Sequence, residues 1–266
     1  MILKKRKAIP DQEEESYFIS MTDIMVGLLF IFVIIIMYFA FQLKEQVEER
    51  ENYEKKASQH RSRILEEIRL ILIEKGETEF TIDKEQGILR FPSKVFFASG
   101  QADIPPESRA AELSKKLAVA FSDVLRCSVF NENKRPFDTT YFCKAKNRDS
   151  IFIEALYIEG HTDNVPTGSR LREQYKIVNN LQLSARRATN TYQELINTQP
   201  VLTKFQSPQN EPVFAAAAFG DSRPLALNAD EDGRASNRRI DIRLIMYVPA
   251  TSGALEKYKT MLEGML

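Results

Sequence analysis

The hydrophobic pattern begins with one long apolar run, residues 24–41, which contains no charged side chain. A helix of that length, at about 1.5 Å per residue, crosses the hydrocarbon core of a bilayer. The run begins too late and is too long for a cleaved signal peptide, and no small-residue cleavage site follows it. The sequence contains no second run of this kind. The pattern therefore predicts a single-pass membrane protein with a transmembrane helix over residues 17–43.

Charged residues dominate on both sides of the apolar run. Residues 1–16 are polar and contain Pro10 and three consecutive glutamates, so we expect a short mobile tail. Residues 44–76 are rich in Glu, Lys, Arg and Gln and predict a solvated helical stalk or linker. Within this stalk residues 64–73 become apolar, which indicates packing against another part of the chain before Gly76 ends the helix.

Beyond residue 77 the pattern predicts alternating strands and helices. Apolar and polar positions alternate at residues 80–82 and again at 88–91, with a turn between them, which is typical of a hairpin. Helical spacing covers residues 106–121 and 181–196, a polar loop covers 122–149, and apolar runs predict strands at 151–159, 213–219 and 240–248. This order predicts an α+β domain with a mixed sheet over residues 77–249, followed by a helical C-terminal tail, residues 250–266.

Composition narrows the classes of partner. The formal net charge is zero, and no basic patch interleaved with aromatic residues occurs, which argues against nucleic acid as a partner. Basic residues flank the apolar run on both sides, so charge counting leaves the orientation in the membrane open. Cys127 and Cys143 lack metal-ligand spacing. They form a disulfide in an oxidising compartment or remain free thiols in a reducing one, and the sequence leaves both possibilities open.

Asp23 is the one ionisable carboxyl between Glu15 and Glu45, and it lies at the entrance to the apolar run. A carboxylate at membrane depth costs several kcal/mol unless it faces water, a protein partner or a proton, and such residues commonly mark ion or proton pathways. The alternative is a helix cap at the level of the lipid headgroups, a position where Asp is common. Asp23 is therefore a candidate ion-transfer residue, with capping as the structural alternative.

Five ordered sequence blocks carry the candidate chemistry of the C-terminal half. They are FASGQA at residues 97–102, GHTDNVP at 160–166, N-x-x-L-S-x-x-R-A at 180–188, GDSRP at 220–224 and GRASNRRI at 233–240. A lone G-H-T-D is a weak signal, whereas five blocks in this order are specific. Together they resemble the peptidoglycan-binding domain of the OmpA/MotB type, and the resemblance covers more than half of the chain.

The resemblance implies the OmpA-like fold, with helices on one face of the mixed sheet, and a site for the diaminopimelate of the peptidoglycan stem peptide. The free end of that ligand is zwitterionic and needs one anion and one cation. The resemblance assigns the ligand ammonium to Asp163 and the ligand carboxylate to the bidentate guanidinium of Arg187. It implies hydrogen bonds from Thr162 and Asn180 and an apolar wall from Leu183. A mutual surface ion pair of Asp163 and Arg187 is the structural alternative.

The remaining polar residues of these blocks are expected to be structural. His161 has no second His or Cys at ligand spacing, so we expect it to orient the strand-to-loop turn by hydrogen bonding and not to bind a metal. Asn237, Arg238 and Arg239 are expected in turns and ion pairs, with contact to the ligand left open. The long segment 164–186 is expected to cover part of the site. No catalytic residue, metal or cofactor is expected, because no zinc-ligand set or Cys–His pair suggests a hydrolase.

The N-terminal helix resembles the ion-carrying helix of MotB-type stator subunits, through SMTDIM at residues 20–25 and LLFIF at 28–32. ExbD and TolR carry a similar single helix with an Asp near its cytoplasmic end. Flagellar members of the group usually contain Trp in this region, and this chain has no Trp. Within the group the helix is most similar to the ZorB subunits of Zorya antiphage defence systems.

This second resemblance implies an inner-membrane protein with a cytoplasmic N-terminus and a periplasmic C-terminal domain. Asp23 then lies near the cytoplasmic end of the span and exchanges an ion, with a proton favoured over sodium. The implied partners are a second copy of the chain and a ring of five multi-pass MotA/ZorA-like subunits, with peptidoglycan as the anchor. A motility stator and a passive wall tether are the alternative functions. The sequence leaves the ion, the stoichiometry, the cellular output and the downstream signal open.

Overall fold

The structure is a computed structural model that describes residues 12–98 and 100–265. Residues 1–11 of the predicted tail lie outside the described residues. The chain divides into two compact units, Met1–Glu51 and Asn52–Leu266, and each is treated by itself below. One helix, α1 (Gln12–Glu74), contributes residues to both units.

The first unit consists, within the described residues, of the N-terminal part of α1. Residues 12–16, which the sequence pattern assigned to the tail, are helical. The large apolar side chains of residues 24–41 are exposed. Among the described helices, α1 is the one long and apolar enough to cross a membrane, judged by length and composition.

The second unit begins at Asn52, earlier than the predicted domain boundary at residue 77. In the C-terminal part of α1 one side of the helix is buried, at positions one, three or four residues apart. The buried residues are Tyr53, Ala57, His60, Ile64, Leu65, Ile68 and Leu72, and the apolar ones belong to the core. This spacing is that of an amphipathic helix packed on a core. After Glu74 the backbone turns at Gly76, whose φ of 82° suits glycine at a helix end.

A five-stranded mixed sheet forms the centre of the second unit, in the order β1-β2-β5-β3-β4. Strands β3 and β4 pair in parallel and all other neighbours pair antiparallel. The strands are β1 (Thr81–Asp83), β2 (Ile88–Pro92), β3 (Ile153–His161), β4 (Phe214–Gly220) and β5 (Arg239–Met246). The predicted hairpin and three predicted strands are therefore present, within a few residues of their expected bounds.

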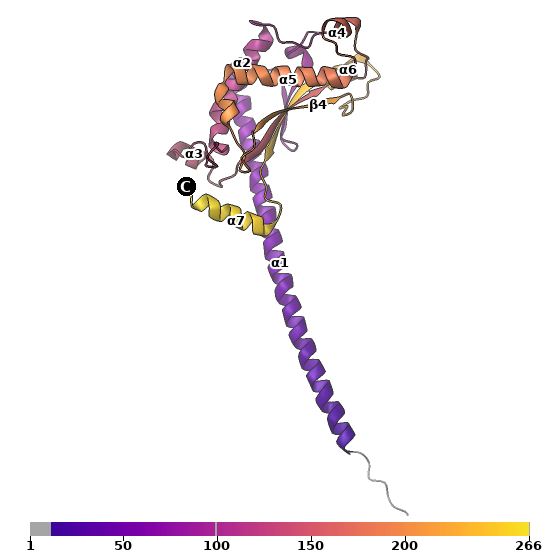
Figure 1. Ribbon diagram of the computed structural model, residues 1–266, viewed down its shortest axis with the longest axis vertical. Coiled ribbons are helices and arrows are strands. Elements are labelled where there is room, and N and C mark those ends of the chain that lie inside the picture. The colour runs from indigo at the N-terminus through magenta and orange to yellow at the C-terminus, as the bar shows by residue number, and fades with distance from the viewer. Residues whose placement is uncertain (1–11, 99, 266) are drawn as a thin grey trace, which may run out of the picture. The chain divides into compact units, whose positions relative to one another are not determined.

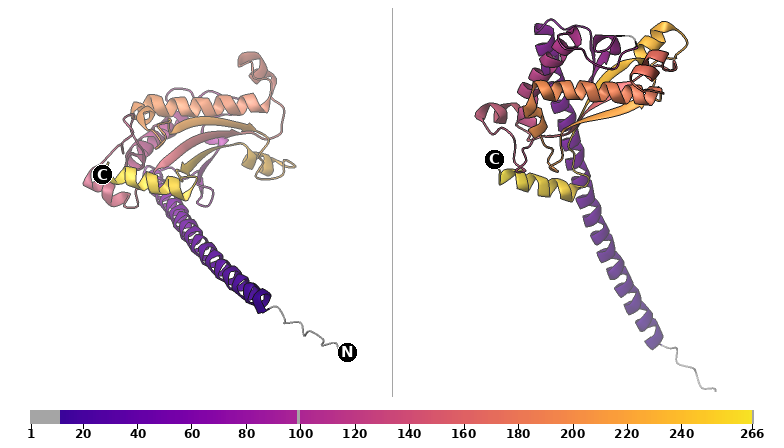
Figure 2. Two further views of the ribbon diagram at one scale, coloured as in Figure 1. Left: turned by 60° about the horizontal axis from the view of Figure 1, so that its bottom comes forward. Right: turned by 45° about the horizontal axis from the view of Figure 1, so that its top comes forward.

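Two long helices, α2 (Arg109–Leu125) and α5 (Asn180–Thr198), accompany the sheet, and α5 lies across β3 and β4 (Figure 1). The shorter elements are η1 (Ser93–Val95), η2 (Arg126–Ser128), α3 (Tyr141–Lys146), α4 (Ser169–Gln174), η3 (Pro200–Lys204), α6 (Glu231–Asn237) and α7 (Ser252–Glu263). Figure 2 shows α5 along one side of the strands from two further directions. Helix α7, predicted as a tail, packs Leu255, Tyr258 and Leu262 into the same core.

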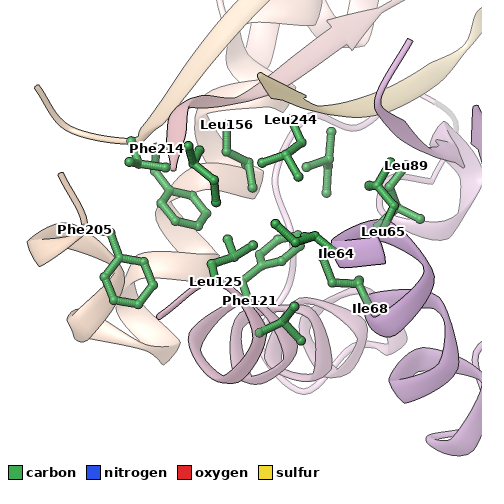
Figure 3. Packing of buried hydrophobic residues seen from close by; sticks show 14 of the residues in the cluster. Ile64, Leu65, Ile68, Leu89, Phe121, Leu125, Leu156, Phe205, Phe214 and Leu244 are labelled. Carbon is green, nitrogen blue, oxygen red and sulfur yellow. The ribbon is translucent and has the colours of Figure 1, made fainter. Parts of the chain in front are cut away.

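The core lies between one face of the sheet and the helices (Figure 3). Leu156 and Leu244 project from the strands toward Phe121 of α2 and Ile64 of α1. On β5 the alternate residues Ile240, Ile242, Leu244 and Met246 face this core, whereas Arg239, Asp241 and Arg243 lie on the other face. The predicted fold class, a long apolar helix plus a mixed sheet with helices, is confirmed.

The segment between α2 and β3 differs from its prediction as a polar loop. Helix α2 extends to Leu125, η2 follows directly, and α3 forms behind Thr140, whose side chain caps it. Cys127 of η2 and Cys143 of α3 form a disulfide with a sequence separation of 16. A helix as short as α3 has too few turns for a visible apolar period, so sequence spacing could not reveal it.

Candidate functional site

The predicted binding residues come from two neighbouring elements, the C-terminal end of β3 and the first turns of α5. Thr162 and Asp163 follow directly after β3. Helix α5 starts at Asn180, and Leu183 and Arg187 follow three and seven residues later, on one face of the helix. Gly160 permits the close approach of the two elements, because a Cβ there would lie 2.2 Å from the Ser184 carbonyl oxygen.

These five residues line one cleft of about 650 Å³. The cleft also receives Ser93, Lys94, Phe97 and Gly100 from the segment after β2, the loop residues 165–168, Leu171 of α4, and Glu231 and Arg238 of the α6 region. The prediction that the GHTD block and the N-x-x-L-S-x-x-R-A block meet in space is therefore met. Their role in binding stays a prediction.

Arg187 carries a buried positive charge at this cleft. The residue is 5% exposed, and burial, the largest cause, lowers the pKa of its guanidinium to about 10, although Asp163 acts in the opposite direction. Its Nε and Nη2 donate to the Gln101 carbonyl oxygen at 3.0 and 2.8 Å, and its Nη1 donates to Ser93 Oγ at 3.1 Å. Among the described residues no carboxylate forms an ion pair with it. A buried cation held by neutral acceptors is suited to bind an anion.

Asp163 does not pair with Arg187, so the alternative of a mutual ion pair is wrong. Its Oδ1 accepts a hydrogen bond from the Val165 backbone N–H at 3.1 Å. Its Oδ2 accepts from Arg238 Nη1 at 2.6 Å, and Arg238 also pairs with Glu231 through Nη2. Arg238 is thus a cleft residue, which the sequence had placed among structural ion pairs with ligand contact left open.

The other three predicted residues have different surroundings. Asn180 donates from Nδ2 to the Asp163 carbonyl oxygen at 3.0 Å and so connects α5 with the end of β3. Leu183 packs in a small apolar cluster with Ala102, Leu171 and Ile177. The Thr162 hydroxyl is buried and has no hydrogen-bond partner among the described residues. Residues 165–168 and Leu171 of the segment 164–186 line the cleft, and the expectation that this segment covers part of the site stays a prediction.

His161 does not make the hydrogen bond that the sequence predicted. Its ring nitrogens have no hydrogen-bond partner among the described residues, and the ring stacks on Phe219 with centroids 5.2 Å apart. Its Nε2 lies 3.8 Å from a carboxylate oxygen of Glu159 and 3.8 Å from one of Asp241. The same two carboxylates accept hydrogen bonds from arginines.

These carboxylates belong to the sheet-face cluster, which we define as Arg90, Glu159, Arg239, Asp241 and Arg243. Arg90 Nε and Arg239 Nε lie 2.9 Å from the two oxygens of Asp241. Arg243 holds Glu159 with two bonds, at 2.7 and 3.0 Å. Glu159, His161 and Asp241 together offer three metal-ligating groups. Because three guanidiniums already hold both carboxylates, we interpret the group as an ion-pair network and not as a metal site.

Sequence reasoning missed Ser93, Lys94 and Glu231, which line the cleft, and the backbone carbonyl of Gln101, which accepts hydrogen bonds from Arg187. A backbone acceptor has no side-chain signature, so the sequence could not identify that role of Gln101. Ser93 lies after β2, outside the five blocks. Asp23, the candidate ion-transfer residue, lies on α1 in the first unit and its side chain is exposed.

No protein-family model matches the chain. The sequence is 31% identical over 90 residues to "Motility protein B" of Bacillus subtilis, which covers 34% of this chain. The match spans 30% of the length of that relative, so we treat the activity and partners of the whole protein as proposals. Over the matched segment the chain is similar to that relative.

Three solved structures are similar in shape. A putative MotB-like protein from Desulfovibrio vulgaris is 21% identical, covers 73% of this chain and 95% of its own, and has a TM-score of 0.49. The cell wall anchor of the T6SS from Pseudomonas aeruginosa is 21% identical, with 65% and 90% covered and a TM-score of 0.41. The periplasmic domain of Helicobacter pylori MotB is 16% identical, with 66% and 84% covered and a TM-score of 0.41.

Proposed function

We propose that the second unit binds peptidoglycan through the cleft, and that α1 anchors this unit in the bacterial inner membrane. The observation that supports wall binding is the buried, unpaired charge of Arg187 in one cleft with the carboxylate of Asp163. A zwitterionic ligand end has an anion for the first group and a cation for the second. Thr162, Asn180 and Leu183 then contact the rest of the diaminopimelate.

We propose further that the chain is a stator-type subunit, with Asp23 as its ion-transfer residue. Support comes from the position of Asp23 in α1, directly before the exposed apolar run of residues 24–41, and from the likeness to "Motility protein B". Each elementary charge that moves through 100 mV releases about 2.3 kcal/mol, so several transfers can drive a mechanical step. In this proposal two copies pair inside a five-membered ring of MotA/ZorA-like subunits, and the wall holds them fixed. The N-terminus is cytoplasmic and the second unit is periplasmic.

The cellular output that we propose is Zorya-type antiphage defence, on the similarity of residues 20–32 to ZorB subunits. The observation that favours a second candidate, motility, is the similarity to "Motility protein B" of Bacillus subtilis. Deleting the gene in its own host separates the two. Loss of phage resistance with normal swimming supports defence, and loss of swimming with unchanged resistance supports motility.

Wall binding is tested with the full-length chain in detergent, mixed with purified peptidoglycan sacculi and sedimented. We expect the wild type to sediment with the sacculi and Asp163→Asn to remain largely in the supernatant, because the amide loses the negative charge. The matched control is Asp221→Asn, an exposed carboxylate in the loop after β4. Equal sedimentation of Asp163→Asn and wild type overturns the proposed site.

Ion transfer is tested by co-expressing the chain with its membrane partner and measuring proton or sodium flux across inverted vesicles. Asp23→Asn is expected to abolish the flux and Asp23→Glu to retain part of it, since a glutamate still binds and releases an ion. The control is Glu45→Gln, which removes a carboxylate on the other side of the apolar run. If Asp23→Asn retains full flux and full function, the proposed ion transfer is wrong and the chain is a passive tether.

A further inference from the structure

Arg238 pairs with Asp163, the carboxylate that the proposed function assigns to the ligand ammonium. It caps the C-terminus of α6, just before β5, and its side chain is about one third exposed. Its Nη1 lies 2.6 Å from Asp163 Oδ2. In the free protein, therefore, a cation of the chain itself already neutralises the proposed ammonium acceptor.

The carboxylate of Asp163 is held in one orientation. The residue is 8% exposed, and its Oδ1 accepts the Val165 N–H in a tight local turn. Oδ2 is thus the oxygen available to a cation, and it is the oxygen that Arg238 holds. Two cations on one carboxylate repel each other, so an incoming ammonium and the Arg238 guanidinium compete for the same atom.

Glu231 offers Arg238 a second partner. It lies in the first turn of α6, its side chain is largely exposed, and it accepts from Arg238 Nη2. Arg238 can leave Asp163 and keep an ion pair with Glu231. Burial alone lowers the pKa of Arg238, but the two carboxylates outweigh it and raise that pKa, so the guanidinium stays charged throughout the exchange.

We propose that Arg238 is a positioning residue that competes with the ligand: it covers Asp163 in the free protein and transfers to Glu231 when the ligand ammonium binds. This inference rests on the proposed function of the cleft. It predicts that competition by Arg238 lowers the affinity of the cleft for a stem peptide. It also predicts selectivity, because a ligand end without an ammonium cannot replace Arg238.

The experiment uses the full-length chain in detergent and calorimetric titration with a synthetic stem tripeptide ending in diaminopimelate. Arg238→Gln removes the competitor and is expected to bind on the order of fivefold tighter, the size typical of a partly exposed ion pair. Arg238→Lys keeps a cation and is expected to remain near wild type. Glu231→Gln removes the second partner and is expected to bind roughly threefold more weakly.

A second ligand separates competition from a structural effect. Both ligands carry an acetylated N-terminus, so the side-chain amine of diaminopimelate is their one ammonium. When that amine is acetylated as well, the tripeptide carries no ammonium, and the advantage of Arg238→Gln over wild type is expected to disappear. A merely structural role would change affinity for both ligands equally. Thermal unfolding of each variant confirms that it is folded, and Glu231→Gln serves as the mild variant, since that side chain is exposed.

The outcomes distinguish this inference from the proposed function. If wild type binds, Asp163→Asn does not, and Arg238→Gln binds no tighter, both cations share the carboxylate and the competition is overturned. Weaker binding by Arg238→Gln shows that Arg238 contacts the ligand carboxylate, which also overturns it. If the wild type binds neither tripeptide nor sacculi, the proposed function fails, and this inference fails with it.

Discussion

The sheet-face cluster and the cleft are two groups of buried charge that meet along β3, and they differ in how their charges are matched. In the sheet-face cluster every charged group has an oppositely charged partner within 3.0 Å: Asp241 holds two arginines and Glu159 holds Arg243. In the cleft, Arg187 has only neutral acceptors. Both groups contain deeply buried charged residues, Asp241 and Glu159 in the first and Arg187 and Asp163 in the second, so burial alone does not separate a structural site from a binding site.

The matching of charges separates them. In a closed ion-pair network every charge already has a partner of opposite sign, so no charge is available to bind a ligand. Removing one member leaves the buried charges of its partners without a counter-charge. An unmatched buried charge is a cost in the free protein that an external ion can relieve. The comparison therefore predicts that substitutions in the sheet-face cluster reduce stability, whereas substitutions at Arg187 chiefly reduce binding.

The largest expected effect is that of Asp241→Ala. Asp241 is 1% exposed, and its loss leaves Arg90 and Arg239 without a carboxylate. We expect the free energy of unfolding to fall by about 3–5 kcal/mol. Urea denaturation of the full-length chain measures it. The control Asp221→Ala, at an exposed position, should stay within about 0.5 kcal/mol of wild type.

A loss below about 1 kcal/mol in Asp241→Ala would break the comparison, because a closed network could then not be called structural.

Arg187→Met is expected to show the opposite balance. Methionine keeps the apolar contact with Phe97, whose ring centroid lies 5.1 Å from the guanidinium carbon, but removes the charge. We expect affinity for the stem tripeptide to fall roughly 30- to 100-fold, as for a truncated buried charge pair. Stability should fall by only about 1–2 kcal/mol, since Gln101 and Ser93 lose a donor. Titration and urea denaturation measure the two quantities.

The neighbouring Arg186 is a matched control for Arg187 on the same helix. Its side chain is exposed and pairs with Asp103 at 3.1 Å, so Arg186→Met should change binding and stability little. If Arg186→Met weakens binding as much as Arg187→Met does, general positive charge attracts the wall polymer and the cleft has no special role.

The sequence predicted the five cleft residues because their side chains occur in ordered blocks at the ends of a strand and a helix. It did not predict the matching of charges. Which arginine holds Asp163 depends on the path of α6 into β5, and the acceptor role of Gln101 depends on a backbone carbonyl. Neither has a signature in residue type or spacing.

The same limit applies to the fold. The strands and long helices have clear apolar periods and were predicted near their observed bounds. The start of the second unit at Asn52 was not predicted. Tyr53, Ala57 and His60 are separated by charged residues, and such a pattern suggests a solvated stalk. Burial of that face depends on α7 and on the segment around Cys127, far away in the sequence.

His60 extends the comparison to a buried group whose burial keeps it neutral. It is 4% exposed, its Nε2 lies 2.7 Å from Ser128 Oγ, and Arg63 Nη2 lies 3.3 Å from its Nδ1. Burial first, and Arg63 second, lower the pKa of His60 from 6.5 to about 4, although Asp149 opposes them. As the pH falls, His60 is therefore protonated near pH 6.5 in the unfolded chain and only near pH 4 in the folded chain.

Stability from His60 is therefore complete above pH 6.5 and is lost as the pH falls toward 4. Between pH 7.5 and pH 5 we expect a loss of about 2 kcal/mol in the free energy of unfolding. His60→Gln keeps a donor toward Ser128 and does not titrate, so its loss over this range should be smaller by about that amount. Parallel urea denaturation of both chains at the two pH values measures the difference. If the wild type and His60→Gln lose the same free energy of unfolding between pH 7.5 and pH 5, His60 does not contribute to the pH dependence. Its burial without a matching charge then has no cost.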